Sequence, residues 1–377
     1  MLKSIELHNF KSARDLKVQL NNLTVLTGLN GSGKSTLLQS ITLLKQSLNK
    51  NVLNQCLSLK GPLVSLGRSE DIRYENAESD SIEFIIETPN GTIKISAPTI
   101  DGSDTLPVSC DGDVDDLINQ FQIGFQLIQA DRITPADNYS QANTSQRNTG
   151  WLGCKGEYTI DFLIQNREIK IPSKRKYSEE VSNISIEVLK QLVPTDSLLD
   201  QTTGWLQELS PGSRPQPIAL DDGDATALRF SYSGSTVDSA SRKHKAANVG
   251  FGLTYCLPII VASLSAPTGS ILLIENPEAH LHPRGQAALG LLLAKCASDG
   301  VQIIVETHSD HVINGIRVAT KKGEIDNNDI SVHFFTREIE SGETTVKSPI
   351  LHSNGRFSEW PEGFFDQWSK ALDELLD

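Results

Sequence analysis

In several stretches of the first hundred positions the apolar residues recur with a period of two, which is typical of β-strands with one buried face. The strands expected from this pattern are residues 2–7, 16–20, 81–87 and 92–96. A turn around residues 9–12 joins the first two, and Pro89-Asn90-Gly91 joins the last two as a hairpin. Residues 23–26 are almost continuously apolar, which predicts a buried strand.

A spacing of three or four residues predicts helices with one apolar face. The first is residues 36–48, in which Leu37, Leu38, Ile41, Leu44 and Leu48 share a face. Beyond residue 248, helices expected at 252–264, 285–296, 310–320 and 364–376 alternate with strands expected at 270–275, 301–306, 332–336 and 344–351. This alternation predicts an α/β fold with a mostly parallel central sheet, to which residues 81–96 add an antiparallel β part.

The stretch from residue 101 to 247 has weaker patterns and is expected to be an inserted helical and loop-rich lobe. The predicted elements are an acidic exposed loop at 101–116, a buried strand at 121–129, a mobile polar loop at 138–149, a helix at 179–192, a short element beginning at 205, a proline-rich interruption at 211–217, a strand at 228–232 and a Ser-rich loop at 233–245.

Composition restricts the classes of function. The 377 residues carry a formal net charge of -13, which disfavours indiscriminate binding to the negatively charged backbone of nucleic acid. The five cysteines include no C-x-x-C pair, so we expect reduced thiols in a cytoplasmic protein. No apolar run reaches the length of a membrane span, and the alternating, charged residues 1–6 predict a strand rather than a signal peptide.

The strongest chemical motif lies between the strand at 23–26 and the helix at 36–48. The sequence Gly-Leu-Asn-Gly-Ser-Gly-Lys-Ser-Thr at 28–36 fits the phosphate-loop pattern G-x-x-x-x-G-K-[ST]. Glycines allow backbone N–H groups to point at phosphates, and the helix N-terminus adds positive potential. We expect Lys34 to reach the β- and γ-phosphates and the Ser35 hydroxyl to hold Mg²⁺. The candidate binding residues in this stretch are Asn30, Gly31, Ser32, Gly33, Lys34, Ser35 and Thr36.

An apolar strand at 271–274 ends in Glu275, at the edge of the sheet where a second Mg²⁺ ligand is expected. Because glutamate is one methylene longer than the usual aspartate, the contact could be direct or through water. Asn276 follows, where many related ATPases have a catalytic glutamate. An amide cannot take a proton from water, so Asn276 could either orient a water or leave hydrolysis slow.

Glu278, His280 and His282 follow closely and could position or deprotonate the attacking water. The pair His280-x-His282 could also indicate a metal site, but two imidazoles without further clustered ligands favour a structural role or a contact across a dimer.

A second buried strand, at 301–305, ends in Glu306-Thr307-His308. The helix expected between the two strands is a crossover that places them side by side, so His308 should lie near Glu275 and reach a γ-phosphate. Asn248, Gly250 and Gly252 open the helix at 252–264, where N–H groups could contact a phosphate; a packing turn is the alternative.

Taken in order, these motifs resemble a known family. The motifs are similar to ABC-type ATPase heads of the RecF, SMC and Rad50 class and to the ATPase part of OLD-family proteins. They are Asn-Phe-Lys-Ser at 9–12, the phosphate loop, Leu-Leu-Ile-Glu-Asn-Pro-Glu-Ala-His-Leu-His-Pro at 272–283 and Glu-Thr-His-Ser-Asp-His at 306–311. Nearly all of the chain, least clearly about residues 100–245, resembles a prokaryotic AAA-ATPase family with a C-terminal DUF3696 domain. Asn-Gly-Ile-Arg at 314–317 and Trp-Pro-Glu-Gly-Phe-Phe-Asp at 360–366 are similar to the C-terminal motifs of that family.

The resemblance implies ATP and Mg²⁺ as cofactors and a homodimer with ATP sandwiched between two subunits. In it, the turn at Asn248, Gly250 and Gly252 would face the partner's phosphate loop, although it departs from the usual Leu-Ser-Gly-Gly-Gln. Lys11 would lie near the nucleotide and Asn30 near the dimer seam. An OLD-type nuclease activity would need a partner chain, such as a nuclease or toxin-like effector encoded nearby.

These implications predict an ATPase lobe at 1–100, the inserted lobe at 101–247 and a second ATPase lobe at 248–377. The predicted function is a slow ATPase that dimerises on ATP and gates an effector in prokaryotic defence against phages or plasmids, with Glu275, Glu278 and His308 as catalytic candidates. Two alternatives stay open: a non-catalytic, ATP-gated scaffold, favoured by Asn276, and a RecF-like DNA repair ATPase, which the acidic charge does not favour.

Overall fold

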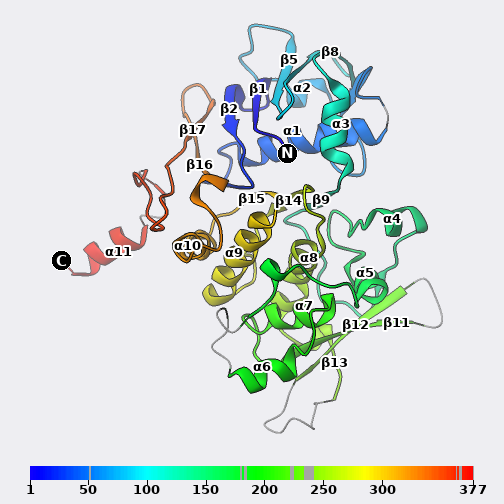
Figure 1. The fold of residues 1–377 in the computed structure, drawn as a ribbon. Helices are drawn as coiled ribbons and strands as arrows, with labels where there is room; N and C mark the ends of the chain where they lie inside the picture. Colours follow the sequence, from blue (N-terminus) through cyan, green and yellow to red (C-terminus); the bar gives the residue numbers. More distant parts are fainter. Residues whose placement is uncertain are drawn as a thin grey trace. The chain divides into compact units, whose positions relative to one another are not determined.

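The computed structural model describes residues 1–50, 52–178, 181, 185–220, 225–232, 242–361, 363–364 and 367–376. The chain forms two compact units, each assembled from segments distant in sequence (Figure 1). Unit 1 comprises residues 1–123, 302–310 and 326–377, and unit 2 comprises residues 124–301 and 311–325.

Unit 1 contains an antiparallel sheet in the order β2-β1-β5-β6-β8. Its strands are β1 Ser4–Phe10, β2 Ala13–Gln19, β5 Ser81–Glu87, β6 Thr92–Pro98 and β8 Ser109–Asp111. Alternate residues of β5 and β6 are buried, including Phe84 and Ile95, which face each other across the pair. The predicted period of two and the hairpin at 89–91 are therefore confirmed.

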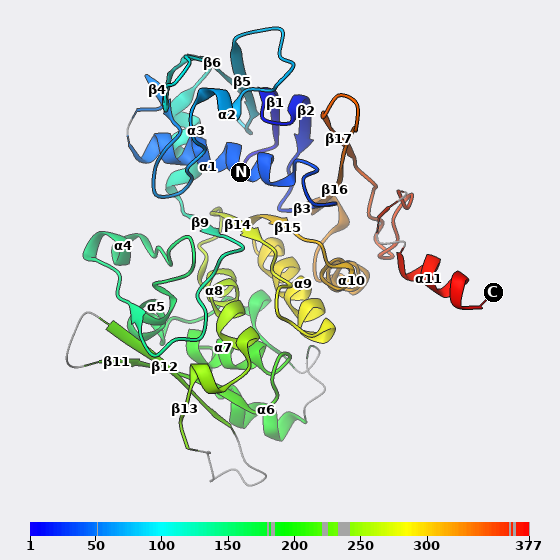
Figure 2. The ribbon, with the colours of Figure 1, turned by 180° about the vertical axis from the view of Figure 1, so that it is seen from behind.

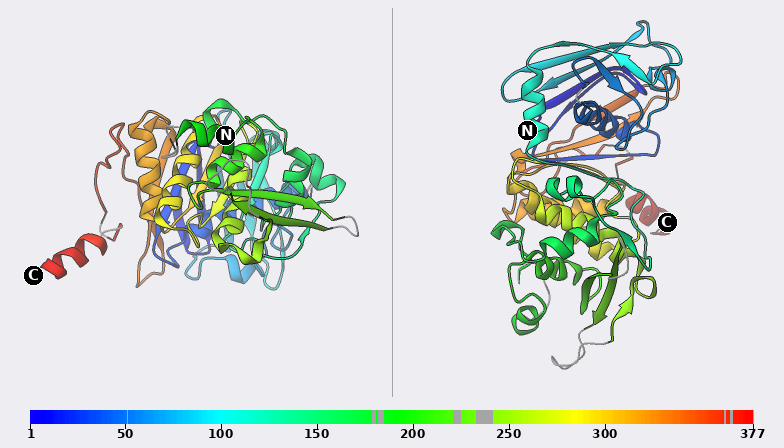
Figure 3. Two further views of the ribbon diagram at one scale, coloured as in Figure 1. Left: turned by 90° about the horizontal axis from the view of Figure 1, so that it is seen from below. Right: turned by 90° about the vertical axis from the view of Figure 1, so that its right-hand side faces the viewer.

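The parallel strands of unit 1 are β3 Leu23–Gly28, β15 Gln302–Glu306 and β16 Ile330–Arg337, with β3 between the other two. β17 Thr344–Lys347 extends the sheet by pairing antiparallel to β16. Helix α1, Lys34–Asn49, packs against β3 and β15, and Figure 3 shows it next to the antiparallel sheet as well. Because α1 has neighbours on two sides, even Ser40, Thr42 and Ser47 are buried and donate hydrogen bonds to carbonyls of their own helix.

The acidic stretch at 101–116 is not the continuous loop that its composition predicted. The elements that complete unit 1 are β4 Cys56–Ser58, α2 Ser69–Ile72, β7 Thr105–Pro107, α3 Val114–Gln122, the 3₁₀ turn η3 Asn327–Asp329 and α11 Gln367–Leu376. Asp113 caps α3, and the buried Asp116 accepts hydrogen bonds from Thr88 and Asn90. The acidic residues therefore serve as a helix cap and a buried polar anchor.

Unit 2 is built around α8, Phe251–Ser265, which is buried along almost its whole length. Helices α5 Thr159–Asn166, α7 Leu198–Leu206 and α9 Pro283–Ser298 contact it, as do the parallel strands β9 Phe125–Ile128 and β14 Ile271–Glu275 (Figure 2). Because α8 is apolar on all sides, every residue from 253 to 264 can be buried. Helix α10 Asp310–Lys321 contributes its residues from His311 onward to this unit.

A small antiparallel sheet occupies another part of unit 2. Its strands are β10 Tyr139–Ser140, β11 Ser213–Ala219, β12 Ala225–Tyr232 and β13 His244–Lys245. The unit also contains α4 Thr144–Thr149, η1 Ser173–Arg175, α6 Ile186–Leu192 and η2 Ala246–Asn248. The interruption predicted at 211–217 is wrong, because Pro215 and Pro217 lie on an edge strand that pairs only with β12 among the described strands.

Three other expectations in this stretch need correction. The buried strand predicted at 121–129 is the end of α3 followed by β9, and the polar loop predicted at 138–149 contains β10 and the capped helix α4. Trp205 lies at the end of α7 rather than at the start of an element. Parts of the predictions at 179–192, 233–245 and 360–366 lie outside the described residues. Within the described part of the chain, no helix is long and apolar enough to cross a membrane.

Candidate functional site

The phosphate loop of unit 1 joins β3 to α1, as the sequence predicted. Gly28, Gly31 and Gly33 have φ values of 138°, 74° and 102°, a region that residues with a side chain rarely adopt. A Cβ atom on Gly33 would lie 2.2 Å from Oγ1 of Thr344. The helix begins at Lys34, two residues earlier than predicted, with Gly33 as its N-cap.

Two polar side chains in this loop, those of Lys34 and Ser32, are buried. The buried Lys34 donates hydrogen bonds from Nζ to the carbonyl oxygens of Gly28 at 3.0 Å and Leu29 at 2.8 Å. The Ser32 hydroxyl is buried and has no hydrogen-bond partner within the described part of the chain. A buried orphan hydroxyl beside glycine N–H groups fits a loop shaped for a phosphate group, which would supply the missing acceptor.

A carboxylate that the sequence reasoning did not assign lies beside this loop. Glu306 ends β15, the strand that pairs in parallel with β3, and its side chain is buried. The Ser35 hydroxyl donates to its carboxylate, with Oγ 2.9 Å from Oε2 and 3.2 Å from Oε1. Nζ of Lys34 lies 3.8 Å from Oε1. The sequence contains a signal for Glu306, because residues 301–306, like residues 271–275, form an apolar stretch that ends in glutamate.

The turn between β1 and β2 packs against the first turns of α1. Nζ of Lys11 donates to Oε1 of Gln39 at 2.7 Å, and burial lowers the pKa of Lys11, an effect that Asp71 opposes. Ser12 Oγ lies 3.5 Å from Oγ1 of Thr36. Lys11 is therefore close to the helix that starts at the phosphate loop, and its contact with nucleotide stays a prediction.

The remaining candidates of unit 1 are on the surface. Asn30 and Gly31 are exposed at the tip of the loop, next to Leu29, which is 74% exposed. His308 is exposed two residues beyond Glu306 and follows the same strand, β15. Its predicted contact with a γ-phosphate stays a prediction.

In unit 2, Glu275 ends β14 and is half-buried. Its Oε2 accepts a hydrogen bond from the backbone N–H of Ala130 at 2.9 Å. Burial raises the pKa of Glu275, while the Ala130 N–H and the charge of Arg132 act in the opposite direction. A bound cation would stabilise the charged form of a partly buried carboxylate, which fits the metal role predicted for Glu275.

The sequence reasoning also missed Arg132, which is 2% exposed and fixes the backbone after β14. Its guanidinium donates to the carbonyl oxygens of Gln129, Glu275 and Asn276 at 3.1, 2.5 and 2.7 Å. The guanidinium also lies over the ring of Tyr255, 4.3 Å from the centroid. Asn276 adopts φ 44°, so Arg132 stabilises a strained turn directly after Glu275.

The histidines after this turn have structural partners. The ring of His280 packs on Phe251 and Tyr255, with centroids 4.5 and 4.9 Å away. His282 accepts from the N–H of Arg284 through Nδ1 at 3.3 Å and so caps α9. Among the described residues, no cluster of three or more histidine, cysteine or acidic side chains could hold a metal ion. The ring contacts of His280 and the cap made by His282 support a structural role for this pair.

Asn248 and Gly250 precede α8 and are exposed. Gly252, in the first turn of α8, packs against the backbone of His280. A Cβ atom on Gly252 would lie 2.6 Å from the carbonyl oxygen of His280. Close packing therefore accounts for Gly252, whereas the predicted contact of this turn with a partner's nucleotide stays a prediction. Glu278, which lies between Asn276 and His280 in the sequence, is half-buried.

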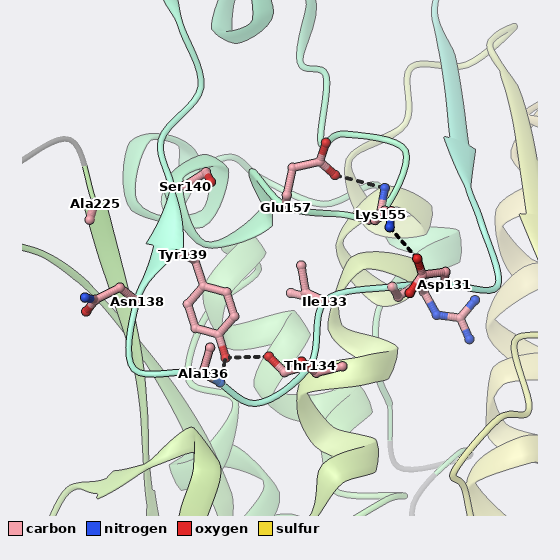
Figure 4. Close-up of a pocket in the computed structure, with 11 residues that line it drawn as sticks. Asp131, Ile133, Thr134, Ala136, Asn138, Tyr139, Ser140, Lys155, Glu157 and Ala225 are labelled. Carbon is pink, nitrogen blue, oxygen red and sulfur yellow. Dashed lines mark hydrogen bonds and ion pairs between the residues drawn. The ribbon is translucent and has the colours of Figure 1, made fainter. Parts of the chain in front are cut away.

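A surface pocket of about 560 Å³ lies elsewhere in unit 2 (Figure 4). Lys155 and Asp131 form an ion pair at its edge, and the N–H of Lys155 donates to Glu157 at 2.9 Å. The Tyr139 hydroxyl bonds to the backbone of Thr134 and Ala136. These groups satisfy one another, so the pocket does not indicate a particular ligand.

Comparisons with solved structures define the class of fold. An SMC head bound to the C-terminal winged-helix domain of ScpA matches over 93% of this chain and 98% of its own, with a TM-score of 0.50 and 15% identity. An SMC head with an extended coiled coil, bound to the C-terminal domain of ScpA and derived from Pyrococcus furiosus, matches over 100% and 99% with a TM-score of 0.50 and 13% identity. The fold is that of an SMC-like, ABC-type ATPase head.

Family comparisons place the chain within this class. The "AAA ATPase domain" family matches residues 1–193, which is more than half of the 377 residues. The family described as "AAA domain, putative AbiEii toxin, Type IV TA system" matches 159–314, and "Protein of unknown function (DUF3696)" matches 325–375. The chain belongs to the AAA ATPase domain family and carries a DUF3696 region near its C-terminus, as the motifs predicted.

An OLD nuclease of Thermus scotoductus is 25% identical over 333 residues. The match covers 82% of this chain and 59% of that protein, so the chain spans less than two thirds of the relative's length.

Proposed function

We propose that this chain binds Mg-ATP at the phosphate loop, hydrolyses it slowly and passes its nucleotide state to a partner effector. The observation that carries the proposal is the convergence of Lys34, Ser35 and Glu306 at the start of α1, beside the orphan hydroxyl of Ser32. When ATP is bound, Mg²⁺ would neutralise charge between the phosphates. Ser35 would hold that ion, and Lys34 would exchange the carbonyls of Gly28 and Leu29 for phosphate oxygens.

Slow hydrolysis is proposed because the residue after Glu275 is an amide. The Asn276 backbone is fixed by Arg132, and its side chain cannot act as a general base. His308 and Glu278 are the groups proposed to orient the attacking water instead. The same asparagine supports the alternative of a non-catalytic scaffold in which ATP only joins subunits; a turnover assay separates the two.

Dimerisation on ATP is proposed from the likeness to SMC-like heads and from the exposed tip of the phosphate loop. Leu29, Asn30 and Gly31 are accessible there, so a second copy could cover them. We further propose that the effector is a nuclease or toxin-like protein of a prokaryotic defence system. Support comes from the family described for a toxin–antitoxin system and from the OLD nuclease relative.

Replacement of Lys34 tests nucleotide binding directly. Lys34→Ala removes the cation that would contact the phosphates, so ATP affinity should fall by at least about 100-fold, equivalent to about 2.7 kcal/mol. Isothermal titration calorimetry with Mg-ATP measures this, and Lys45→Ala, at the far end of the same helix, is the matched control. Unchanged affinity in Lys34→Ala would contradict the proposed site.

A further inference from the structure

Glu306 and Ser35 form a contact between the end of β15 and the first turn of α1. Ser35 is exposed in the first turn of α1, and its hydroxyl donates to the buried Glu306. The separation of Ser35 Oγ and Glu306 Oε2 is 2.9 Å. Two oxygens therefore lie side by side where this class of loop holds its metal ion.

The separation matches the geometry of a magnesium ion. Oxygen ligands lie about 2.0–2.1 Å from Mg²⁺ in an octahedron, so two adjacent ligands are about 2.8–3.0 Å apart. Magnesium in nucleotide sites is bound by one or two protein side chains together with phosphate oxygens and water. We propose that Glu306 is a carboxylate ligand of the nucleotide's Mg²⁺, adjacent to Ser35. This inference rests on the proposed function, since it needs ATP at this loop.

The charges around Glu306 have a consequence for ATP binding. The carboxylate lies 3.8 Å from Nζ of Lys34, the cation expected to contact the phosphates. A triphosphate that approaches without a metal ion meets a buried negative charge, which repels it and competes for Lys34. With Mg²⁺ between them, the same carboxylate attracts the complex. Glu306 therefore makes ATP affinity strongly dependent on Mg²⁺.

Glu275 keeps its own predicted role in this proposal. Its carboxylate belongs to unit 2, where it accepts from the Ala130 N–H, whereas Glu306 shares unit 1 with Ser35. The two glutamates can be distinguished experimentally, because the proposal assigns the metal requirement of initial ATP binding to Glu306.

The test compares ATP affinity with and without metal in the full-length chain. Calorimetry measures binding of a non-hydrolysable ATP analogue in EDTA and over a Mg²⁺ series to wild type, Glu306→Gln and Glu306→Asp. Mn²⁺ electron paramagnetic resonance measures bound metal directly. The matched control is Glu87→Gln, which removes another strand-end carboxylate that accepts from a serine, Ser4 Oγ at 3.0 Å.

Glu306→Gln should raise the Mg²⁺ concentration for half-maximal binding by at least about tenfold, the usual effect of losing a metal-site group. Its affinity in EDTA should equal or exceed that of wild type, because the repelling charge is gone. The Mg²⁺ concentration for half-maximal binding to Glu306→Asp should lie between the values for wild type and Glu306→Gln. The value for Glu87→Gln should match that of wild type.

A shift of less than about twofold in Glu306→Gln would overturn the proposal, since that is within ordinary variation of affinity. An equal loss of affinity in EDTA and in Mg²⁺ would also overturn it, because Glu306 would then only maintain the loop. If wild type binds no ATP in either condition, the proposed function itself fails. If wild type binds ATP equally well with and without Mg²⁺, ATP binding stands and the proposed role of Glu306 is overturned.

Discussion

Gly31 and Gly33 lie two residues apart in the phosphate loop and both have positive φ, but their surroundings differ. A Cβ on Gly33 would collide with Thr344, whereas a Cβ on Gly31 would have no atom within 4 Å. Positive φ costs an alanine about 1–2 kcal/mol at either position. Only Gly33 adds a steric clash, so the two glycines can be used as a matched pair.

We expect Gly33→Ala to lower ATP affinity by at least about tenfold more than Gly31→Ala, a difference of about 1.4 kcal/mol. The reason is that the loop must move away from Thr344, which changes the position of Lys34. Calorimetry on both variants measures the difference. Equal losses would show that backbone strain alone, and not the contact with β17, determines the effect.

Arg132 provides a second prediction at the scale of one residue. Arg132→Met would leave three carbonyl oxygens without their donor and should lower the free energy of unfolding by about 2–4 kcal/mol. Thermal unfolding measures the loss, and Arg14→Met is the control because its side chain is 50% exposed. ATP turnover should fall as well, because the turn after Glu275 loses its support. A variant as stable as wild type would contradict the assigned role.

At the scale of elements, a buried histidine connects β16 to the end of β2. His333 Nε2 lies 2.7 Å from the carbonyl oxygen of Gln19 and so donates to it, which leaves Nδ1 to accept from Ser348 Oγ at 2.7 Å. Burial lowers the pKa of His333 below its ordinary 6.5, and the hydrogen bond to Gln19 opposes this in part. Between this lowered pKa and 6.5, the imidazole is therefore neutral in the folded state but protonated in the unfolded state.

Stability should therefore be highest above pH 6.5 and fall as the pH drops toward the lowered pKa of folded His333. The loss can reach about 1.4 kcal/mol per pH unit for one such group. His333→Gln should unfold more easily at pH 8 but lose less stability between pH 7 and 5. Urea unfolding at each pH measures both profiles, and His352→Gln, at an exposed position, should follow wild type. Parallel profiles for His333→Gln and wild type would contradict this account.

At the scale of the whole molecule, the candidate residues are divided between the two compact units. Unit 1 holds the phosphate loop, Glu306 and His308, and unit 2 holds Glu275, Glu278 and the turn before α8. In the proposed function ATP joins two copies of the chain. Nucleotide state should therefore determine the oligomeric state.

A variant that binds ATP but does not hydrolyse it should accumulate as a dimer. Glu275→Gln removes the charge proposed to support the metal during hydrolysis, so Mg-ATP should double its molar mass in multi-angle light scattering. Lys34→Ala should stay monomeric under the same conditions. A constant mass for Glu275→Gln with saturating Mg-ATP would contradict dimerisation on ATP.

The elements that the sequence predicted best are those with long, regular patterns. β3, α1, β14, α9, β15 and α10 were placed within a few residues, because each combines a continuous apolar pattern with a glycine or polar boundary. Between residues 101 and 247 the prediction was poorer. There, short strands such as β7 and β10 and the proline-containing β11 depend on partners distant in sequence, which no local pattern reveals.

The sequence by itself determined the phosphate loop, since its glycines, lysine and serine are contiguous and their chemistry depends on local backbone geometry. It also determined the alternation of strands and helices, because burial of apolar faces leaves a periodic pattern. Only the tertiary structure decided that Glu306 meets Ser35 and that Arg132 supports the turn after Glu275. These contacts join residues more than a hundred positions apart, and a buried charge is placed by the partners that compensate it, which only the folded chain brings together.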